Sequence, residues 1–197
     1  METEILEQEF CHEGFFKLSR FRLRHSLFRG GWSDALVRER FERGHEVVAA
    51  LLYDPARDSV VLVEQFRIGA LENPGGAWLM ETVAGVCDEG EDPREVIRRE
   101  VREEAGCDAQ DLVEIAQFYV SPGGSTERVH LFCARVDSAS AGDLQGLAHE
   151  GEDIRVHVLA AEQALDRLRA QTIDTGYTII ALQWLALYRS ELRKRWA

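Results

Sequence analysis

The sequence is poor in the residues that build disulfide frameworks and thiolate–imidazole metal sites. Its 197 residues include only four cysteines and six histidines. Cys11, Cys87, Cys107 and Cys133 lie far apart, without the short spacings of zinc or redox motifs, and the histidines do not cluster. We therefore expect free thiols, which are typical of a reducing compartment.

Long apolar runs are absent too. No stretch approaches the roughly 20 apolar residues that a helix needs to cross a bilayer. The chain begins METEILEQEF, which is acidic and has neither the basic nor the apolar region of a secretory signal. These absences predict a cytoplasmic protein with no membrane partner.

Basic residues are outnumbered. There are 23 Lys and Arg against 35 Asp and Glu, a formal net charge of −12. A nucleic-acid partner is not expected, because affinity for the phosphate backbone depends on neutralising it with Lys and Arg. A small anionic substrate would need bound metal or particular arginines beside it. The acidic excess is consistent with a carboxylate–metal site, although solubility alone would also explain it.

Apolar residues make up 45% of the chain, enough for a substantial core in one domain with an addition. Arginines alternate with Phe21 and Leu23, which predicts a half-buried strand in a small β unit over residues 1–45. Residues 46–197 then form the main domain. We expect its strands at 46–54, 59–67, 78–86, 112–120, 128–136 and 154–159, and helices at 93–105, 161–170 and 177–196. This interleaving predicts an α/β fold.

The segment from Gly85 to Cys107 carries the strongest signal. Its residues Gly85, Glu91, Arg99, Glu100, Glu103, Glu104 and Gly106 have the spacing G-x5-E-x7-R-E-x-x-E-E-x-G. Seven such matches arise by chance about once in 10⁸ windows. The spacing places several carboxylates on one helical face beside a glycine-rich turn, an arrangement suited to holding a divalent metal against a phosphate chain.

Local residues predict where this helix begins and ends. Asp92-Pro93 favours a first turn, and Gly106 is the residue type preferred just past a helix end. Glu100, Glu103 and Glu104 are neighbours on one stripe, where like charges repel. Oxygen-rich carboxylate sites suit Mg²⁺ or Mn²⁺, whereas the alternative is a solvated acidic face.

This segment resembles the Nudix box, the signature of hydrolases acting on nucleoside diphosphates linked to another group. The resemblance implies an α/β/α sandwich, Mg²⁺-dependent pyrophosphate cleavage, and metal ligation by Glu100 and Glu104, with Glu91 and Arg99 largely structural. Cys107 stands where the family usually has an aliphatic residue, which a buried cysteine can replace.

The segments EQFR (64–67), SPGGSTE (121–127) and HEGEDIRV (149–156) resemble the ADP-ribose pyrophosphatase branch of this family. That likeness implies ADP-ribose as substrate, two or three Mg²⁺ ions with Mn²⁺ as a substitute, and a homodimer with a domain-swapped N-terminal β unit. It adds the Ala84 carbonyl and Glu152 as metal ligands and Glu150 as catalytic base. Which of Glu150 and Glu152 is the base stays open, and an exposed acidic loop is the alternative.

The same likeness implies the substrate contacts. Arg67 would pair with the diphosphate, Glu127 would bind the terminal ribose, and Val86 would contribute backbone. The adenine side is assigned to Phe15, Phe16, Arg38, Glu39 and Arg43, partly from the partner subunit. From sequence alone, Phe15 and Phe16 could equally belong to the core.

Two other functions compete with ADP-ribose hydrolysis. One is a Nudix enzyme that prefers another nucleotide sugar, such as GDP-mannose or ADP-glucose, which the box does not exclude. The other is a sensor that binds ADP-ribose-like ligands without cleaving them. Intact carboxylates at Glu100, Glu103 and Glu104, and the lack of an added basic module, argue against the sensor.

Overall fold

The computed structural model describes residues 1–147, 149 and 151–196, and they fold as two compact units. The first comprises Met1–Glu46 together with Phe118–Val129, and the second comprises Val47–Gln117 together with His130–Ala197. The functional division at residue 45 remains a prediction.

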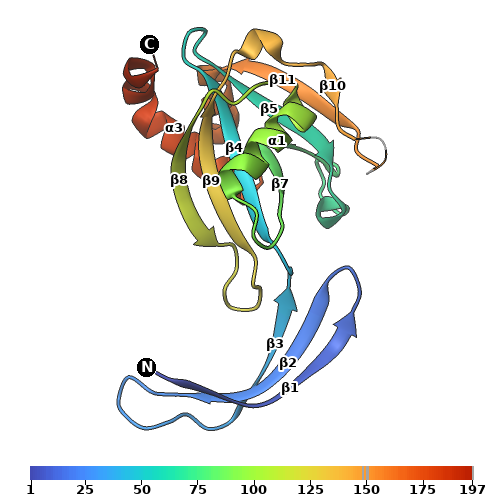
Figure 1. Cartoon of the computed structure of the whole chain (residues 1–197), viewed down its shortest axis with the longest axis vertical. Helices are drawn as coiled ribbons and strands as arrows, with labels where there is room; N and C mark the ends of the chain where they lie inside the picture. Colours follow the sequence, from blue (N-terminus) through green and yellow to red (C-terminus); the bar gives the residue numbers. More distant parts are fainter. Residues whose placement is uncertain (148, 150, 197) are drawn as a thin grey trace. The chain divides into compact units, whose positions relative to one another are not determined.

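The first unit is built on a three-stranded antiparallel sheet in the order β1-β2-β3, drawn in blue in Figure 1. As predicted, Phe21 of the second strand is buried. The alternating arginines point outward and pair with glutamates of the first strand: Arg20 with Glu9 at 3.0 Å, Arg22 with Glu7 at 3.4 Å and Arg24 with Glu4 at 2.5 Å. The strands are β1 (Thr3–Glu13), β2 (Lys17–His25) and β3 (Leu36–Glu42).

Strand β1 was not expected from the sequence. Every one of its residues is exposed, so it has no alternation of buried and exposed positions that would mark a strand. Its structure comes from pairing with β2, in which acidic and basic side chains face each other across the two strands.

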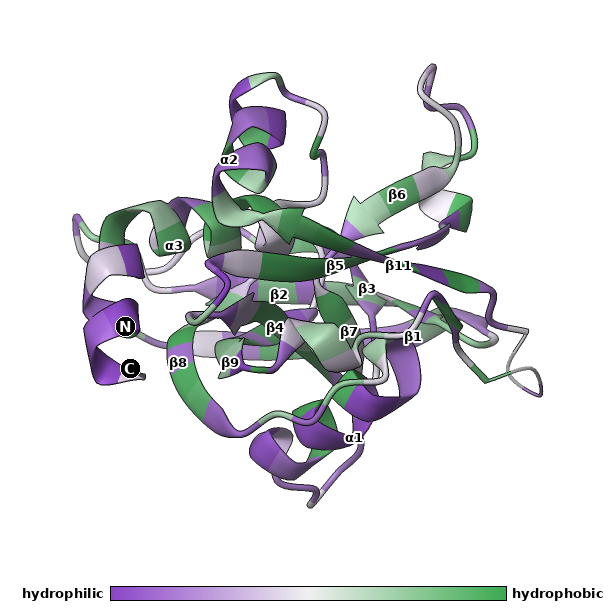
Figure 2. Ribbon diagram, turned by 90° about the horizontal axis from the view of Figure 1, so that it is seen from above, coloured by the Kyte–Doolittle hydropathy of each residue, from purple (hydrophilic) through white to green (hydrophobic). Residues whose placement is uncertain are grey.

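The main sheet has the order β10-β11-β5-β4-β9-β8, with β6 paired to β5 and β7 paired to β4. Figure 2 shows α1 on one face and α2 and α3 on the other, the α/β/α layering that the sequence predicted. The strands are β4 (Glu46–Asp54), β5 (Ser59–Phe66), β6 (Trp78–Glu81), β7 (Val83–Cys87), β8 (Asp111–Tyr119), β9 (Arg128–Arg135), β10 (Leu144–Gln145) and β11 (Ile154–Ala160). The helices are α1 (Pro93–Ala105), α2 (Ala161–Arg169) and α3 (Gly176–Arg195), with short 3-10 turns at Ile68–Ala70 and Ser138–Ser140.

Helix α1 has the predicted bounds. The Asp92 side chain accepts from the Arg94 N–H at 2.9 Å, and Pro93 occupies the first turn. Gly106 ends the helix with a φ of 70°, a left-handed conformation that glycine adopts without strain. Its apolar stripe packs on β4 and β5 and forms much of the core, through Val96, Ile97, Val101 and Ala105.

The strand predicted over 78–86 is in fact two strands. β6 pairs with β5, whereas β7 pairs with β4, so the chain changes partner between them. At the break, the Thr82 N–H donates to Thr178 Oγ1 of α3 at 3.0 Å instead of to a strand. The sequence predicts one strand because the residues on both sides of Thr82 are mostly apolar.

The four cysteines are free thiols, as predicted, with Cys11 exposed and the others buried. Among the described residues, no helix combines the length and apolar character needed to span a bilayer.

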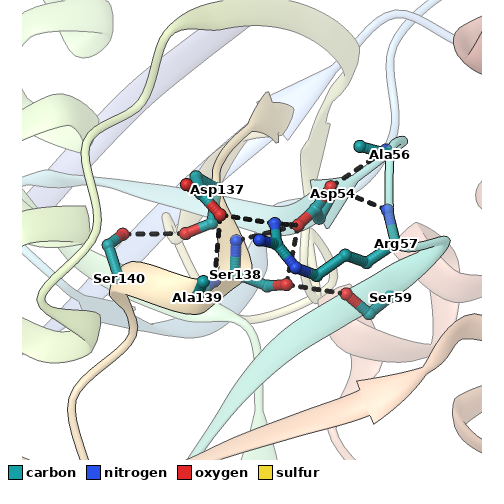
Figure 3. A network of polar contacts seen from close by, with 8 residues as sticks. All are labelled: Asp54, Ala56, Arg57, Ser59, Asp137, Ser138, Ala139 and Ser140. Atoms are coloured by element: carbon teal, nitrogen blue, oxygen red, sulfur yellow. Dashed lines mark hydrogen bonds and ion pairs between the residues drawn. The ribbon is translucent and has the colours of Figure 1, made fainter.

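A buried carboxylate joins the β4–β5 turn to the end of β9 (Figure 3). Asp54 is 1% exposed and accepts from the N–H groups of Ala56 and Arg57 at 2.9 and 3.1 Å. It also accepts from the Ser138 N–H at 3.0 Å and hydroxyl at 2.7 Å, and from the Arg57 guanidinium at 2.9 Å. Burial alone would raise the pKa of Asp54, but these donors outweigh it and hold the pKa well below its ordinary value.

We predict that Asp54→Asn lowers the free energy of unfolding by about 1–3 kcal/mol at pH 7, because an amide N–H₂ would face buried donors. The folded-state pKa lies below the ordinary value of 3.8, so the unfolded chain takes up the proton first on acidification. The stabilisation is therefore present above pH 3.8 and is lost below it. Urea unfolding from pH 7 to pH 3 should show the difference between variant and wild type shrinking at the acid end.

Asp137→Asn is the matched control. Asp137 pairs with the same arginine at 2.6 Å, but its side chain is 54% exposed. Its loss should cost less than about 1 kcal/mol. Equal losses in the two variants would contradict the role given to burial of Asp54.

Candidate active site

The carboxylate of Glu100 lies directly against the backbone of β7. A Cβ atom added at Gly85 would fall well inside van der Waals contact with the Glu100 carboxyl group. The first glycine of the motif is therefore needed for close approach between strand and helix, since any side chain there would displace Glu100. The Glu100 side chain is 16% exposed and also accepts from Arg99 at 3.4 Å.

Glu104 is attached to two strands. It is 3% exposed, its Oε2 accepts from the Ala84 N–H of β7 at 3.1 Å, and its Oε1 accepts from Gln65 Nε2 of β5 at 3.4 Å. These contacts bring together Ala84, Glu100 and Glu104, three of the residues expected to hold metal. Gln65 was missed from sequence, where it stands beside Glu64 at the polar end of a largely apolar strand and no motif singles it out.

Burial dominates the electrostatics of this pair. It raises the pKa of Glu100 to about 7 and that of Glu104 to about 8. Neighbouring carboxylates push both pKa values further up: Glu103 and Glu152 act on Glu100, and Glu100 and Glu152 act on Glu104. Three carboxyl groups from two segments are thus close enough to repel one another, which is the environment that a divalent cation would relieve.

Glu152 reaches this cluster because its loop is fastened to the last turn of α1. The Gly142 N–H donates to the Ala105 carbonyl at 3.1 Å, and the Gly146 N–H donates to the Glu103 carbonyl at 3.2 Å. Within the loop, Glu152 Oε2 accepts from the Leu147 N–H at 3.1 Å. Glu150, the predicted base, lies outside the described residues, and its role stays a prediction.

The donor set fits Mg²⁺ or Mn²⁺ in kind, since it consists of carboxylate oxygens beside a strand backbone. Among residues 1–147, 149 and 151–196, no three His, Cys, Asp or Glu side chains are already grouped as metal ligands. Each of the three carboxylates instead accepts a hydrogen bond from the protein.

An ion pair between two motif residues, Arg99 and Glu91, stabilises the turn before α1. Arg99 Nη1 lies 3.0 Å from Glu91 Oε1, and Glu91 Oε2 accepts from the Asp88 N–H at 3.0 Å. These contacts match the structural role expected for Glu91 and Arg99. They hold the glycine-rich turn against the helix that carries Glu100 and Glu104.

Arg67 follows β5 and is bound by a partner that sequence reasoning missed. Its Nε lies 2.6 Å from Glu81 Oε2 of β6, and Glu81 is 2% exposed. Gln65 of the same strand contacts Glu104, so Arg67 lies two residues beyond a contact with the carboxylate cluster. Val86 of β7 is 43% exposed and free of the core.

The residues expected on the adenine side lie in the first unit. Phe15 is 90% exposed, whereas Phe16 is half-buried against Phe41, with ring centroids 4.8 Å apart. The Arg43 guanidinium lies 5.2 Å from the Phe16 ring, and the Arg43 N–H donates to Thr126 Oγ1 at 3.1 Å.

Thr126 belongs to the loop that carries Glu127, so Phe16, Arg43 and that loop are brought together. Arg38 and Glu39 are exposed on β3, and Glu39 accepts from Arg20 at 3.1 Å.

A hollow of about 260 Å³ lies elsewhere in the second unit. It is lined by Glu64, Trp78, Leu144, Asp153 and Arg155. Successive residues of a strand point to opposite faces, so Glu64 faces away from the side on which Gln65 contacts Glu104. The carboxylate cluster is not part of this hollow.

Comparison with known proteins places these features in a family. A model of the NUDIX domain matches residues 43–178. ADP-ribose pyrophosphatase of Escherichia coli strain K12 is 45% identical over 196 residues, which cover 100% of this chain and 93% of that protein. ADP-ribose pyrophosphatase of Haemophilus influenzae is 44% identical over 99% of this chain and 91% of that protein. GDP-mannose pyrophosphatase of Cronobacter sakazakii is 35% identical over 95% of this chain and 96% of that protein.

A solved structure shares the fold. It is described as the crystal structure of an ADP compounds hydrolase, and it superposes with a TM-score of 0.75 at 19% identity, covering 98% of this chain and 97% of that one. The domain match, the full-length relatives and the carboxylate helix packed against the Gly85 strand agree, and the chain therefore belongs to the Nudix family of hydrolases.

Proposed function

We propose that the protein hydrolyses nucleoside diphosphate sugars, and ADP-ribose in preference, giving AMP and ribose 5-phosphate. The observation that carries this proposal is 45% identity along the whole chain to proteins named ADP-ribose pyrophosphatase. The identity to GDP-mannose pyrophosphatases is lower, at 35%. The predicted specificity residues Arg67 and Glu127 favour the same choice.

Metal would be held by the Ala84 carbonyl, Glu100, Glu104 and Glu152. The carboxylates of this set already raise one another's pKa, which supports a cation between them. When bound, two or three Mg²⁺ ions would neutralise the diphosphate and lower the pKa of a coordinated water.

The side chains have separate tasks in the reaction. Arg67 pairs with the diphosphate, which a guanidinium can do through two parallel hydrogen bonds. Water attacks one phosphorus atom; a new P–O bond forms, the bridging P–O bond breaks, and the attacking water loses a proton. Glu150 accepts that proton, which a carboxylate with an ordinary pKa near ~4.3 can do when the water is acidified.

Recognition of the adenosine part is assigned to the first unit. Phe15 is exposed and available for stacking, and Phe16 is held by Phe41 and Arg43. The homodimer implied by the sequence resemblance, in which Arg38 and Glu39 would be among the contacts to the adenosine part, belongs to the same proposal.

The substrate is tested by comparing kcat/KM for ADP-ribose, ADP-glucose and GDP-mannose at millimolar Mg²⁺, with and without chelator. We expect ADP-ribose to exceed GDP-mannose by at least ~10-fold, within the range that a few pocket contacts provide. Activity should vanish with chelator. A preference for GDP-mannose would keep the box chemistry and overturn the specificity assigned here.

Glu104→Gln tests the metal site. We expect kcat/KM to fall at least ~10²-fold, since even residues that only support a ligand cost 10–100-fold. The Mg²⁺ concentration for half-maximal activity should rise. Glu95→Gln on the same helix is the control, because its side chain is 75% exposed and it should leave the Mg²⁺ titration unchanged. An unchanged titration in Glu104→Gln would remove Glu104 from the metal site.

Glu150→Gln distinguishes a role as catalytic base from a role as metal ligand. A general base contributes about 10²–10⁴-fold, so kcat should fall by that factor while the Mg²⁺ titration stays as in the wild type. Glu152→Gln should instead shift the Mg²⁺ titration. If the two variants behave the other way round, the roles of Glu150 and Glu152 are exchanged.

A further inference from the structure

Glu81 is a buried carboxylate whose charged partner is half-exposed. Glu81 is 2% exposed, whereas 37% of the Arg67 side chain is exposed. The two are joined by a hydrogen bond of 2.6 Å from Nε of the guanidinium. A guanidinium held at Nε can still present its two terminal amino groups to a second anion in a fixed plane.

The carboxylate is itself fixed from the other side. The Tyr177 hydroxyl, in the first turn of α3, hydrogen-bonds to Glu81. One residue further along each segment, Thr178 accepts from the Thr82 N–H at 3.0 Å. Glu81 therefore lies between a helix start and Arg67, with its backbone fixed at the point where β6 gives way to β7.

Stability does not explain the placement of this pair. Burying an ion pair is often no better for folding than filling the same space with apolar side chains. The neighbouring β4 and β5 are packed with buried aliphatic residues, so an apolar pair would suit this part of the sheet. A buried acid that fixes an arginine at a strand end is better explained by what the arginine does there.

We propose that Glu81 is a positioning residue for hydrolysis: it holds Arg67 by Nε so that the terminal amino groups meet the substrate diphosphate. This inference rests on the proposed function and assigns it a residue outside the Nudix motif. Glu81 does not touch substrate, and Tyr177 supports it. Because β5 carries Gln65, which contacts Glu104, Arg67 directly follows the strand that borders the carboxylate cluster.

The orientation of the Arg67 guanidinium should affect the rate of hydrolysis. A mobile Arg67 would still be attracted to a diphosphate, but its two donors would lose their fixed direction. Misplacement of a positioning group by about 1 Å can cost about 10²-fold in rate. Replacing Glu81 should therefore impair turnover even though Arg67 is still present.

A double-mutant cycle tests this directly. We expect Glu81→Gln to lower kcat/KM by about 10–100-fold, with the Mg²⁺ titration unchanged. In an Arg67→Gln background, adding Glu81→Gln should change kcat/KM by less than ~2-fold, because the residue acts through the arginine. The inference would be overturned if the double variant lost kcat/KM by the product of the two single losses. A Glu81→Gln enzyme with wild-type kcat/KM would also overturn it.

Two further variants guard against a folding artefact. Glu64→Gln removes a carboxylate from the opposite face of β5, where it lies 2.9 Å from His157, and should leave kcat/KM within ~2-fold of the wild type. If Glu81→Gln does not fold, Tyr177→Phe takes its place in the cycle. It leaves the carboxylate present and should show a smaller loss that again vanishes with Arg67→Gln.

Hydrolysis by the wild-type protein tests the proposed function separately from the role of Glu81. The cycle uses whichever nucleoside diphosphate sugar the wild type hydrolyses fastest, so an error in specificity does not affect it. A wild type that hydrolyses none would overturn the proposed function, and the same cycle is then measured as ADP-ribose affinity by calorimetry. Coupling between positions 67 and 81 supports the inference, and additive losses overturn it.

Discussion

The structure of the site depends on one close contact, the packing of the Glu100 and Glu104 side chains onto the backbone of β7. Gly85 makes room for the first carboxylate, and the Ala84 N–H binds the second. Burying two carboxylates is costly, as their raised pKa values show, and the apolar stripe of α1 compensates by packing on β4 and β5. The fold thus stabilises, through its core, a concentration of negative charge that would be unfavourable by itself.

Local sequence signals were enough to define the parts of the site that lie on one element. Asp92, Pro93 and Gly106 fixed the bounds of α1, because caps and helix ends are determined by neighbouring residues. The motif spacing likewise identified the carboxylates that the structure brings together. Recognition of the family supplied the rest of the assignments, most of which remain predictions.

Features that depend on contacts between distant segments could not be read from the sequence. Strand β1 has no buried face and exists through its partner, and the break at Thr82 depends on a hydroxyl in α3. Gln65 follows Glu64 at the polar end of β5, and Glu81 is the polar residue that ends β6. Their partners, Glu104 and Arg67, are 39 and 14 positions away, so only the folded sheet shows what they bind.

The loop that carries Glu152 is joined to α1 by backbone donors, and this has a consequence for how the sequence can vary. The Gly142 and Gly146 N–H groups use carbonyls at the helix end that have no partner within the helix. Such bonds leave side chains out of the interaction, yet Gly146 is restricted: its φ is 98°, and a Cβ atom there would also press on the Cβ of Glu152, whereas a Cβ atom at Gly142 would only require the Gln145 side chain to move. A glycine outside the motif is therefore constrained by backbone geometry alone, because its conformation holds the Glu152 loop on the helix.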